Sequence, residues 1–276
     1  RSGQFTELAG SFSHIKHIEY VDQNPIGRSS RSNPVTYIKA YDDIRELFAK
    51  QNVSKIRNYQ AKHFSFNVDG GRCEVCKGDG EVTIEMQFMA DVHLECEACN
   101  GKRFKKEVLE VTFEGKNIDN ILRMTIDEAL SFFTEQKQTK ITQKLQPLQD
   151  VGLGYVQLGQ SSSTLSGGEA QRIKLASFLV KGTIKDKALF VFDEPTTGLH
   201  FHDIKKLLAS FDALIEKGHS IIVIEHNLDL IKCADWIIDL GPEGGENGGQ
   251  LLGAGTPEDL VKMKKSITAS YLKEKL

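Results

Sequence analysis

Two Cys-x-x-Cys pairs set the strongest limit on what this chain can fold into. Cys73 and Cys76 form the first pair, Cys96 and Cys99 form the second, and the nineteen residues at positions 77–95 lie between them. A segment of this length can fold as a hairpin that returns the second pair beside the first, so that four thiolates surround one metal ion. This ligand set and spacing favour zinc. The alternatives are two redox-active pairs or a chance clustering.

The segment between the pairs has the pattern of a β-hairpin. Residues 81–88 alternate apolar and polar side chains, and the alternation resumes at Val92 and Leu94 after an expected turn at 89–91. Each pair is followed by a glycine, Gly78 or Gly101, which permits the tight turn of a chelating knuckle. We predict one zinc ion per chain in a module at about residues 70–106. A closed four-cysteine site has no open coordination position, so its role is structural.

A basic cluster follows the last cysteine and is a candidate DNA-binding surface. It consists of Lys102, Arg103, Lys105 and Lys106. Residues 70–106 contain seven acidic and six basic side chains, so a solvated charged face is an equal alternative from the sequence alone. The net charge of −3 neither predicts nor excludes DNA as a partner.

Composition argues against a membrane protein. The chain has 276 residues, 39% hydrophobic and 26% charged, which suits one large or two smaller globular domains. No run approaches the ~20 apolar residues that cross a bilayer, and no secretory signal is visible, so we expect a cytoplasmic protein with reduced cysteines. The isolated Cys233 is expected to pack in the core. The first residue is Arg1 rather than Met, which suggests that the chain begins partway through a longer polypeptide.

Strands and helices alternate from residue 188 onward and predict an α/β fold. The apolar runs Ala188–Phe192 and Ser220–Ile224 predict two buried strands, and Asp203–Lys217 has helical spacing that Gly218 ends. The remaining expected elements are a helix near Asn227–Ala234, strands at Trp236–Leu240 and Gln250–Ala254, and a last helix that Thr256 caps and Pro257 begins. Upstream, Thr125 and Glu128 predict a capping box at the start of another helix.

The string Leu-Ser-Gly-Gly-Glu-Ala-Gln-Arg at Leu165–Arg172 is the most specific motif in the chain. Ser166 and Glu169 have the spacing of a capping box, which satisfies backbone donors at a helix start. Gly167 and Gly168 leave the first turn without side chains, so a phosphate can approach the N–H groups at the positive end of the helix. The alternative is a well-capped helix with no ligand.

Two adjacent carboxylates follow this motif, and a histidine follows them farther along the chain. Asp193 and Glu194 end the first apolar run, where one carboxylate can hold magnesium and the other can orient an attacking water. His226 ends the second run, where an imidazole can sense or stabilise a terminal phosphate. A lone histidine at a strand end is usually a satisfied polar residue. Here its position, one helix and one strand after the acid pair, favours a nucleotide site.

These motifs resemble those of the ABC ATPase superfamily. Leu165–Arg172 is similar to its signature, Asp193 and Glu194 to its Walker B acids, His226 to its switch histidine, and Gln23 to its Q-loop glutamine. Within the superfamily the chain resembles the UvrA family, and the likeness covers nearly the whole chain. It is carried by Asp22–Gly27, Ser32–Pro34, Phe64–Asn67, Gly70–Cys73, Glu194–His200 and Ile238–Pro242.

The resemblance implies a dimeric subunit of bacterial nucleotide-excision repair that surveys duplex DNA for damage, passes the lesion to UvrB and uses ATP and Mg²⁺. It implies composite sites, in which Ser166, Gly167 and Gly168 act on ATP held by another nucleotide-binding domain. It also implies three regions of the second nucleotide-binding half: a partial ATP-binding lobe with the Q-loop at 1–27, an inserted signature domain at 28–150, and an ATP-binding core at 151–276.

One departure from the superfamily pattern concerns the phosphate-binding loop. No Gly-x-x-x-x-Gly-Lys-Ser/Thr occurs in the sequence, so we expect a P-loop fold that lacks its Walker A segment and a chain that alone is inactive as an ATPase. Two alternatives stay open. One is the ATPase subunit of an ABC transporter, which has no reason to carry a four-cysteine hairpin. The other is a non-enzymatic module that binds zinc and DNA.

Overall fold

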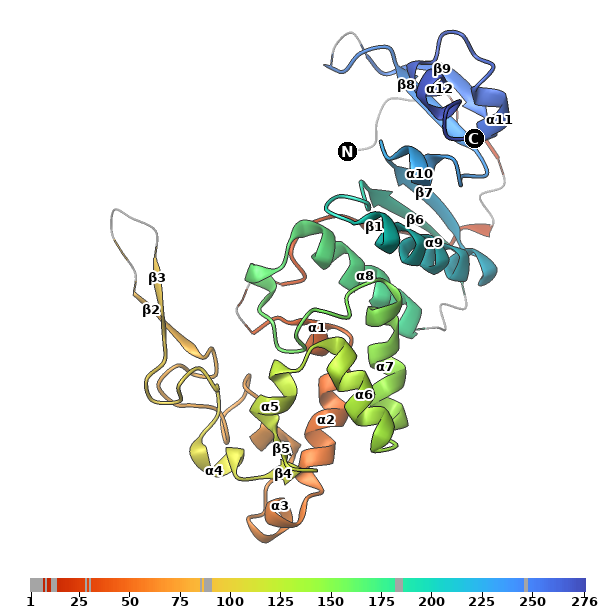
Figure 1. The fold of residues 1–276 in the computed structure, drawn as a ribbon. Coiled ribbons are helices and arrows are strands. Elements are labelled where there is room, and N and C mark those ends of the chain that lie inside the picture. Colours follow the sequence, from red (N-terminus) through yellow and green to blue (C-terminus); the bar gives the residue numbers. More distant parts are fainter. Residues whose placement is uncertain are drawn as a thin grey trace. The chain divides into compact units, whose positions relative to one another are not determined.

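A computed structural model describes residues 7, 9–10, 14–27, 29, 31–84, 86, 91–181, 186–245 and 248–276. The chain divides into two compact units (Figure 1). The first comprises residues 1–20 together with 186–276, and the second comprises residues 21–185. No described helix is long and apolar enough to cross a membrane.

The second unit is mainly helical. Its helices are α1 (Pro34–Tyr37), α2 (Ala40–Ala49), α3 (Asn52–Ile56), α4 (Lys106–Leu109), α5 (Ile118–Arg123), α6 (Ile126–Glu135), α7 (Thr139–Asp150) and α8 (Gly167–Lys181). The described part of this unit also contains two 3₁₀ turns, η2 (Ala61–Phe64) and η3 (Ser162–Thr164). It contains two hairpins as well: β2 (Glu81–Ile84) with β3 (Val92–Glu95), and β4 (Thr112–Phe113) with β5 (Lys116–Asn117).

Helix α7 is in contact with three other helices of the second unit, α2, α6 and α8 (Figure 1). The amphipathic helices turn their apolar stripes inward, so Ile44, Phe48, Ile126, Phe133 and Leu145 are fully buried. The start of α6 agrees with the sequence prediction. Thr125 and Glu128 exchange side-chain-to-backbone hydrogen bonds of 2.8 and 3.2 Å in a capping box.

The hairpin between the cysteine pairs is present, but it is less buried than the alternation predicts. Strands β2 and β3 pair antiparallel, with Val82 opposite Leu94 and Ile84 opposite Val92. All eight strand residues are exposed, because nothing in the described residues packs against the apolar face. The expected turn at 89–91 begins with residues outside the described part of the chain.

The first unit contains a three-stranded sheet in the order β1 (His17–Val21), β6 (Ala188–Asp193) and β7 (Ser220–Ile224). Strands β6 and β7 are parallel, and helix α9 (Phe201–Glu216) connects them. Phe190 and Phe192 of β6 are fully buried, and the Phe192 ring lies 4.7 Å from that of Phe211 in α9. The remaining elements of the unit are α10 (Leu228–Ile231), β8 (Ile237–Gly241), β9 (Gln250–Gly255), α11 (Pro257–Leu260) and α12 (Ile267–Leu272).

Two expectations for the first unit, the full burial of the second apolar run and the burial of Cys233, are wrong. Strand β7 is not buried on both faces: Ile222 and Ile224 are exposed, whereas Ile221 and Val223 between them are half-buried. Strands β8 and β9 do not extend the main sheet but form a separate antiparallel pair. Cys233 is exposed rather than a core residue, since it follows the short helix α10 with its thiol against the Asp229 carbonyl.

Candidate functional site: a four-cysteine cluster and nucleotide-site motifs

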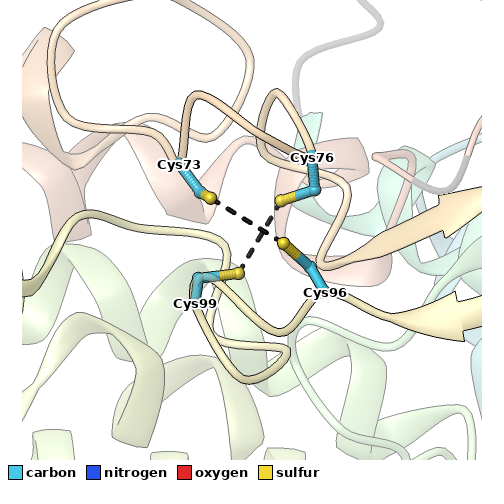
Figure 2. A group of neighbouring side chains, drawn as sticks. All are labelled: Cys73, Cys76, Cys96 and Cys99. Atoms are coloured by element: carbon cyan, nitrogen blue, oxygen red, sulfur yellow. Dashed lines mark hydrogen bonds between the residues drawn. The ribbon is translucent and has the colours of Figure 1, made fainter.

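The four cysteine side chains converge on one point (Figure 2). The Sγ atoms of Cys73 and Cys96 are 3.9 Å apart, those of Cys76 and Cys99 are 3.7 Å apart, and all four lie within 4.8 Å of one another. All four residues are buried and none is in a disulfide. The sequence prediction that the hairpin brings both pairs together is therefore confirmed.

Backbone turns build this cluster. Gly78 and Gly101 have φ values of 90° and 69°, in the region that favours glycine. A Cβ on Gly78 would stand 2.0 Å from the Phe66 carbonyl oxygen, so no larger residue fits there. The Gly80 N–H donates to the Cys76 sulfur at 3.3 Å, and the Cys73 N–H donates to the Arg103 carbonyl at 2.8 Å. These contacts fix the knuckles independently of the exposed hairpin.

The geometry of the cluster fits zinc. With Zn–S bonds of about 2.3 Å, the edge of a tetrahedron of sulfurs is about 3.8 Å, close to both Sγ–Sγ distances given above. Burial raises the pKa of the Cys76 and Cys99 thiols. Four thiolates packed this closely repel one another, so a nearby positive charge is needed to stabilise them. A divalent metal ion supplies that charge.

The signature string begins helix α8 as its spacing predicts. The Ser166 N–H donates to a Glu169 carboxylate oxygen at 2.7 Å, and the Glu169 N–H donates to the Ser166 hydroxyl at 3.2 Å. The other Glu169 oxygen accepts a hydrogen bond of 2.7 Å from the Tyr155 hydroxyl. Because Glu169 is held from both sides, the glycines of the first turn have a fixed orientation.

The Q-loop candidate lies beside this helix start. A Cβ on Gly167 would stand 3.0 Å from both Cβ and Oε1 of Gln23, so the two residues are in direct contact. The neighbouring backbone is tied to α8: the Gln171 amide donates to the Val21 carbonyl at 2.7 Å, and the Lys174 ammonium is 2.5 Å from an Asp22 oxygen. The hydrogen bond from Lys174 lowers the pKa of Asp22.

The acid pair and the histidine meet in the first unit. Asp193 ends β6 and accepts a hydrogen bond of 3.1 Å from the Tyr20 hydroxyl. Glu194 has a left-handed backbone, with φ of 45°, and its N–H donates to the Ile224 carbonyl at 2.9 Å. His226 Nε2 is 3.6 Å from Glu194 Oε1, and the imidazole is 85% exposed. Two parallel strand ends thus place a carboxylate and an imidazole side by side.

The structure therefore groups the candidate nucleotide-site residues into two sets. Glu194, Asp193 and His226 belong to the first unit, and Gln23 with Ser166 to Glu169 belongs to the second. Their roles in a nucleotide site stay predictions.

The four basic candidates for DNA contact differ in their surroundings. Lys102 and Lys106 are exposed. Lys105 is paired with Glu74 at 2.5 Å, and the Arg103 guanidinium lies over the Phe66 ring at 5.5 Å from its centre. Burial lowers the pKa of Arg103. A role of these four residues in DNA contact stays a prediction.

Sequence reasoning missed several residues that hold these sites. Tyr155, which fixes Glu169, has no sequence signal. Arg31 makes two hydrogen bonds, of 3.0 and 3.1 Å, to the carboxylate of Asp79, three residues after Cys76, and no motif pointed to this pair. Glu225 directly precedes His226, and this adjacency is the one signal that could have found it.

Comparisons with known proteins identify relatives of this chain. The family model described as "ABC transporter" matches residues 75–197. The UvrABC system protein A of Staphylococcus aureus (strain COL) is 55% identical over 276 residues, which is 100% of this chain and 29% of that protein. The protein of the same name from Clostridium perfringens (strain 13 / Type A) is 54% identical over 99% of this chain and 29% of its own length.

A solved structure shares the fold. The crystal structure of UvrA2 from Deinococcus radiodurans superposes with a TM-score of 0.91 at 44% identity, over 98% of this chain and 33% of that one. The chain thus spans less than a third of the curated relatives and about a third of the solved structure. The mixed α/β fold with a buried four-cysteine cluster is ABC-ATPase-like, and the chain belongs to the UvrA family.

Proposed function

We propose that this chain is a nucleotide-binding part of a UvrA-type subunit of bacterial nucleotide-excision repair, acting in the cytoplasm. The observation that carries the proposal is that one chain holds both a four-thiolate cluster and a capped signature helix in contact with the Q-loop glutamine. This chain is 55% identical, over the whole of its own length, to a protein named UvrABC system protein A, and this similarity supports the same function. The partners are duplex DNA, damaged DNA especially, a UvrB-like protein and a second copy of the intact protein.

The zinc ion has a structural role in this proposal. Cys73, Cys76, Cys96 and Cys99 hold it, and it closes the base of the β2–β3 hairpin. Such a closed site supplies folding free energy rather than chemistry. The module places Lys102 and Lys106 on an exposed surface, where they can contact backbone phosphates of DNA.

In the intact protein the two sets of nucleotide-site residues serve composite ATP sites. The Glu194 carboxylate orients the attacking water and accepts its proton, and the adjacent His226 imidazole donates a hydrogen bond toward the terminal phosphate. Asp193 supplies an oxygen for Mg²⁺. The bare N–H groups at Gly167 and Gly168 offer a positive helix end to the phosphates of ATP held by another domain.

The functional regions of the proposal are the partial ATP-binding lobe at 1–27, the signature domain at 28–150 and the ATP-binding core at 151–276. These are divisions by role. Their bounds differ from those of the compact units, which change near residues 20 and 186.

Two measurements test the proposal. The chain by itself, which lacks a phosphate-binding loop motif, should bind one zinc ion and show negligible ATP turnover; turnover that Glu194→Gln abolishes would contradict this. The full-length Staphylococcus aureus relative with its matching segment replaced by this chain should bind damaged duplex in preference to undamaged duplex. Its affinity should fall steeply across a salt series, because phosphate contacts release counterions. Binding that is insensitive to both lesion and salt would contradict a DNA-repair role.

A further inference from the structure

Glu225 holds two loops of the first unit together. One oxygen, Oε1, accepts hydrogen bonds from the Thr196 N–H at 2.8 Å and from the Thr196 hydroxyl at 2.6 Å. The other oxygen, Oε2, accepts from the N–H groups of His226 at 2.9 Å and Asn227 at 3.0 Å. Four donors from two loops therefore converge on one carboxylate.

These loops carry the residues with catalytic roles in the proposed function. Thr196 lies two residues after Glu194 in the loop that follows β6, and Asn227 lies directly after His226 in the loop that follows β7. The loops leave neighbouring parallel strands, and a backbone hydrogen bond from Glu194 to Ile224 already joins them. The Glu225 carboxylate adds a second connection farther from the strand ends.

The same connection lies beside the proposed catalytic pair. The His226 imidazole is 85% exposed and the Glu194 side chain 49% exposed, so neither is fully enclosed by packing. Glu194 also has a left-handed backbone, with φ of 45°, which in a non-glycine residue persists only where surrounding contacts impose it. The hydrogen bonds to Glu225 are such contacts on the neighbouring residues of both loops.

Each oxygen of Glu225 already accepts two hydrogen bonds, so its lone pairs are occupied. A carboxylate in this state is a poor metal ligand and a poor base. Charged acceptors form stronger hydrogen bonds than neutral ones. These properties suit a group that holds backbone in place.

We propose that Glu225 is a positioning residue that locks the Glu194 loop to the His226 loop and sets the geometry of the carboxylate and imidazole. The role in turnover rests on the proposed ATPase function, whereas the role as a lock concerns this chain alone. The two can therefore be tested separately.

The lock is tested by amide hydrogen exchange on this chain. Glu225→Ala removes all four acceptor interactions, so exchange at Thr196, His226 and Asn227 should accelerate about tenfold or more. The matched control is Glu216→Gln, an exposed glutamate at the end of α9, which should leave these amides unchanged. Thr196→Val removes only the hydroxyl bond and is a milder variant for the case in which Glu225→Ala does not fold. It should speed exchange at Thr196 with little effect on the unfolding midpoint. Unchanged exchange in the folded variants would overturn the lock.

The catalytic consequence is tested in the full-length Staphylococcus aureus relative that carries this chain. Glu225→Gln keeps the size of the side chain but replaces one acceptor oxygen with an NH₂ group. This NH₂ group is a donor and would face the N–H groups that now donate to Glu225. The expected result is a fall in kcat of tenfold or more with KM for ATP little changed, since both oxygens of Glu225 are engaged by protein donors. If the parent protein does not hydrolyse ATP, the proposed function fails. If the parent is active and Glu225→Gln is equally active, the positioning role fails while the proposed function stands.

Discussion

Loss of zinc should unfold the β2–β3 hairpin and leave the helical core of the second unit intact. The perturbation is Cys96→Ala, which removes one of four ligands, or a chelator applied to the unaltered chain. The hairpin depends on the metal because all eight residues of its strands are exposed and no described element covers its apolar face. A two-stranded hairpin without such support is at best marginally stable in water.

The size of the effect follows from the cluster geometry. The Sγ–Sγ distances of 3.7 and 3.9 Å need little adjustment for a tetrahedral ion, so the cluster should have the full apparent affinity of a structural zinc site. That affinity is about 10–16 kcal/mol at neutral pH. Without it, the free energy of opening the hairpin should fall to about zero. Helices α2, α6 and α7 bury Phe48, Phe133 and Leu145 away from the thiols, so their stability should change by less than about 1 kcal/mol.

Hydrogen exchange with mass spectrometry, run with and without a chelator, is the suitable assay. Amides of residues 81–84 and 92–95 should lose all protection, while those of α6 and α7 keep theirs. Exposed Cys233, changed to Ala, is the matched control and should affect neither region. The reasoning is refuted if the hairpin stays protected without metal, or if the helical core unfolds together with it.

Three smaller effects follow from the second unit. Ser166→Ala should destabilise the unit by about 1 kcal/mol in urea unfolding, because the cap of α8 is lost; no change would contradict the capping box. A double-mutant cycle on Arg31 and Asp79, both about 30% exposed, should give a coupling of about 1 kcal/mol, and additive effects would show that the pair is not a unit. Lys174 lowers the pKa of Asp22 below its usual 3.8, so this carboxylate stabilises the fold above that pH and the contribution is lost as the pH falls through the lower folded value. The destabilisation caused by Asp22→Asn should therefore shrink steadily below about pH 4, and a difference constant with pH would refute this.

Local patterns predicted the elements whose geometry depends on nearby residues. The cysteine pairs met as predicted, because their spacing and the knuckle glycines favour a local return. The capping boxes at Thr125 and Ser166 formed because each needs only a few consecutive residues. The contact between Gln23 and Gly167 was not predicted from spacing, and it results from packing of α8 against distant backbone.

Burial was harder to predict, because it depends on what covers an element. The apolar run of β7 predicts a buried strand, yet Ile222 is exposed. Arg103 looks like a surface charge in sequence, although its guanidinium stacks on Phe66. Glu225 is an unremarkable acid until the loops that it joins are seen in space. Such partners come from tertiary structure, and no period or spacing encodes them.

Survival after ultraviolet irradiation tests the central claim most directly. A bacterium that lacks its own UvrA protein is supplied with the Staphylococcus aureus relative whose matching segment is replaced by this chain. The account predicts that survival is restored, and that Glu194→Gln in the same protein abolishes the rescue while the protein is still made and still binds zinc. No rescue by the unaltered protein, or equal rescue by Glu194→Gln, would contradict it.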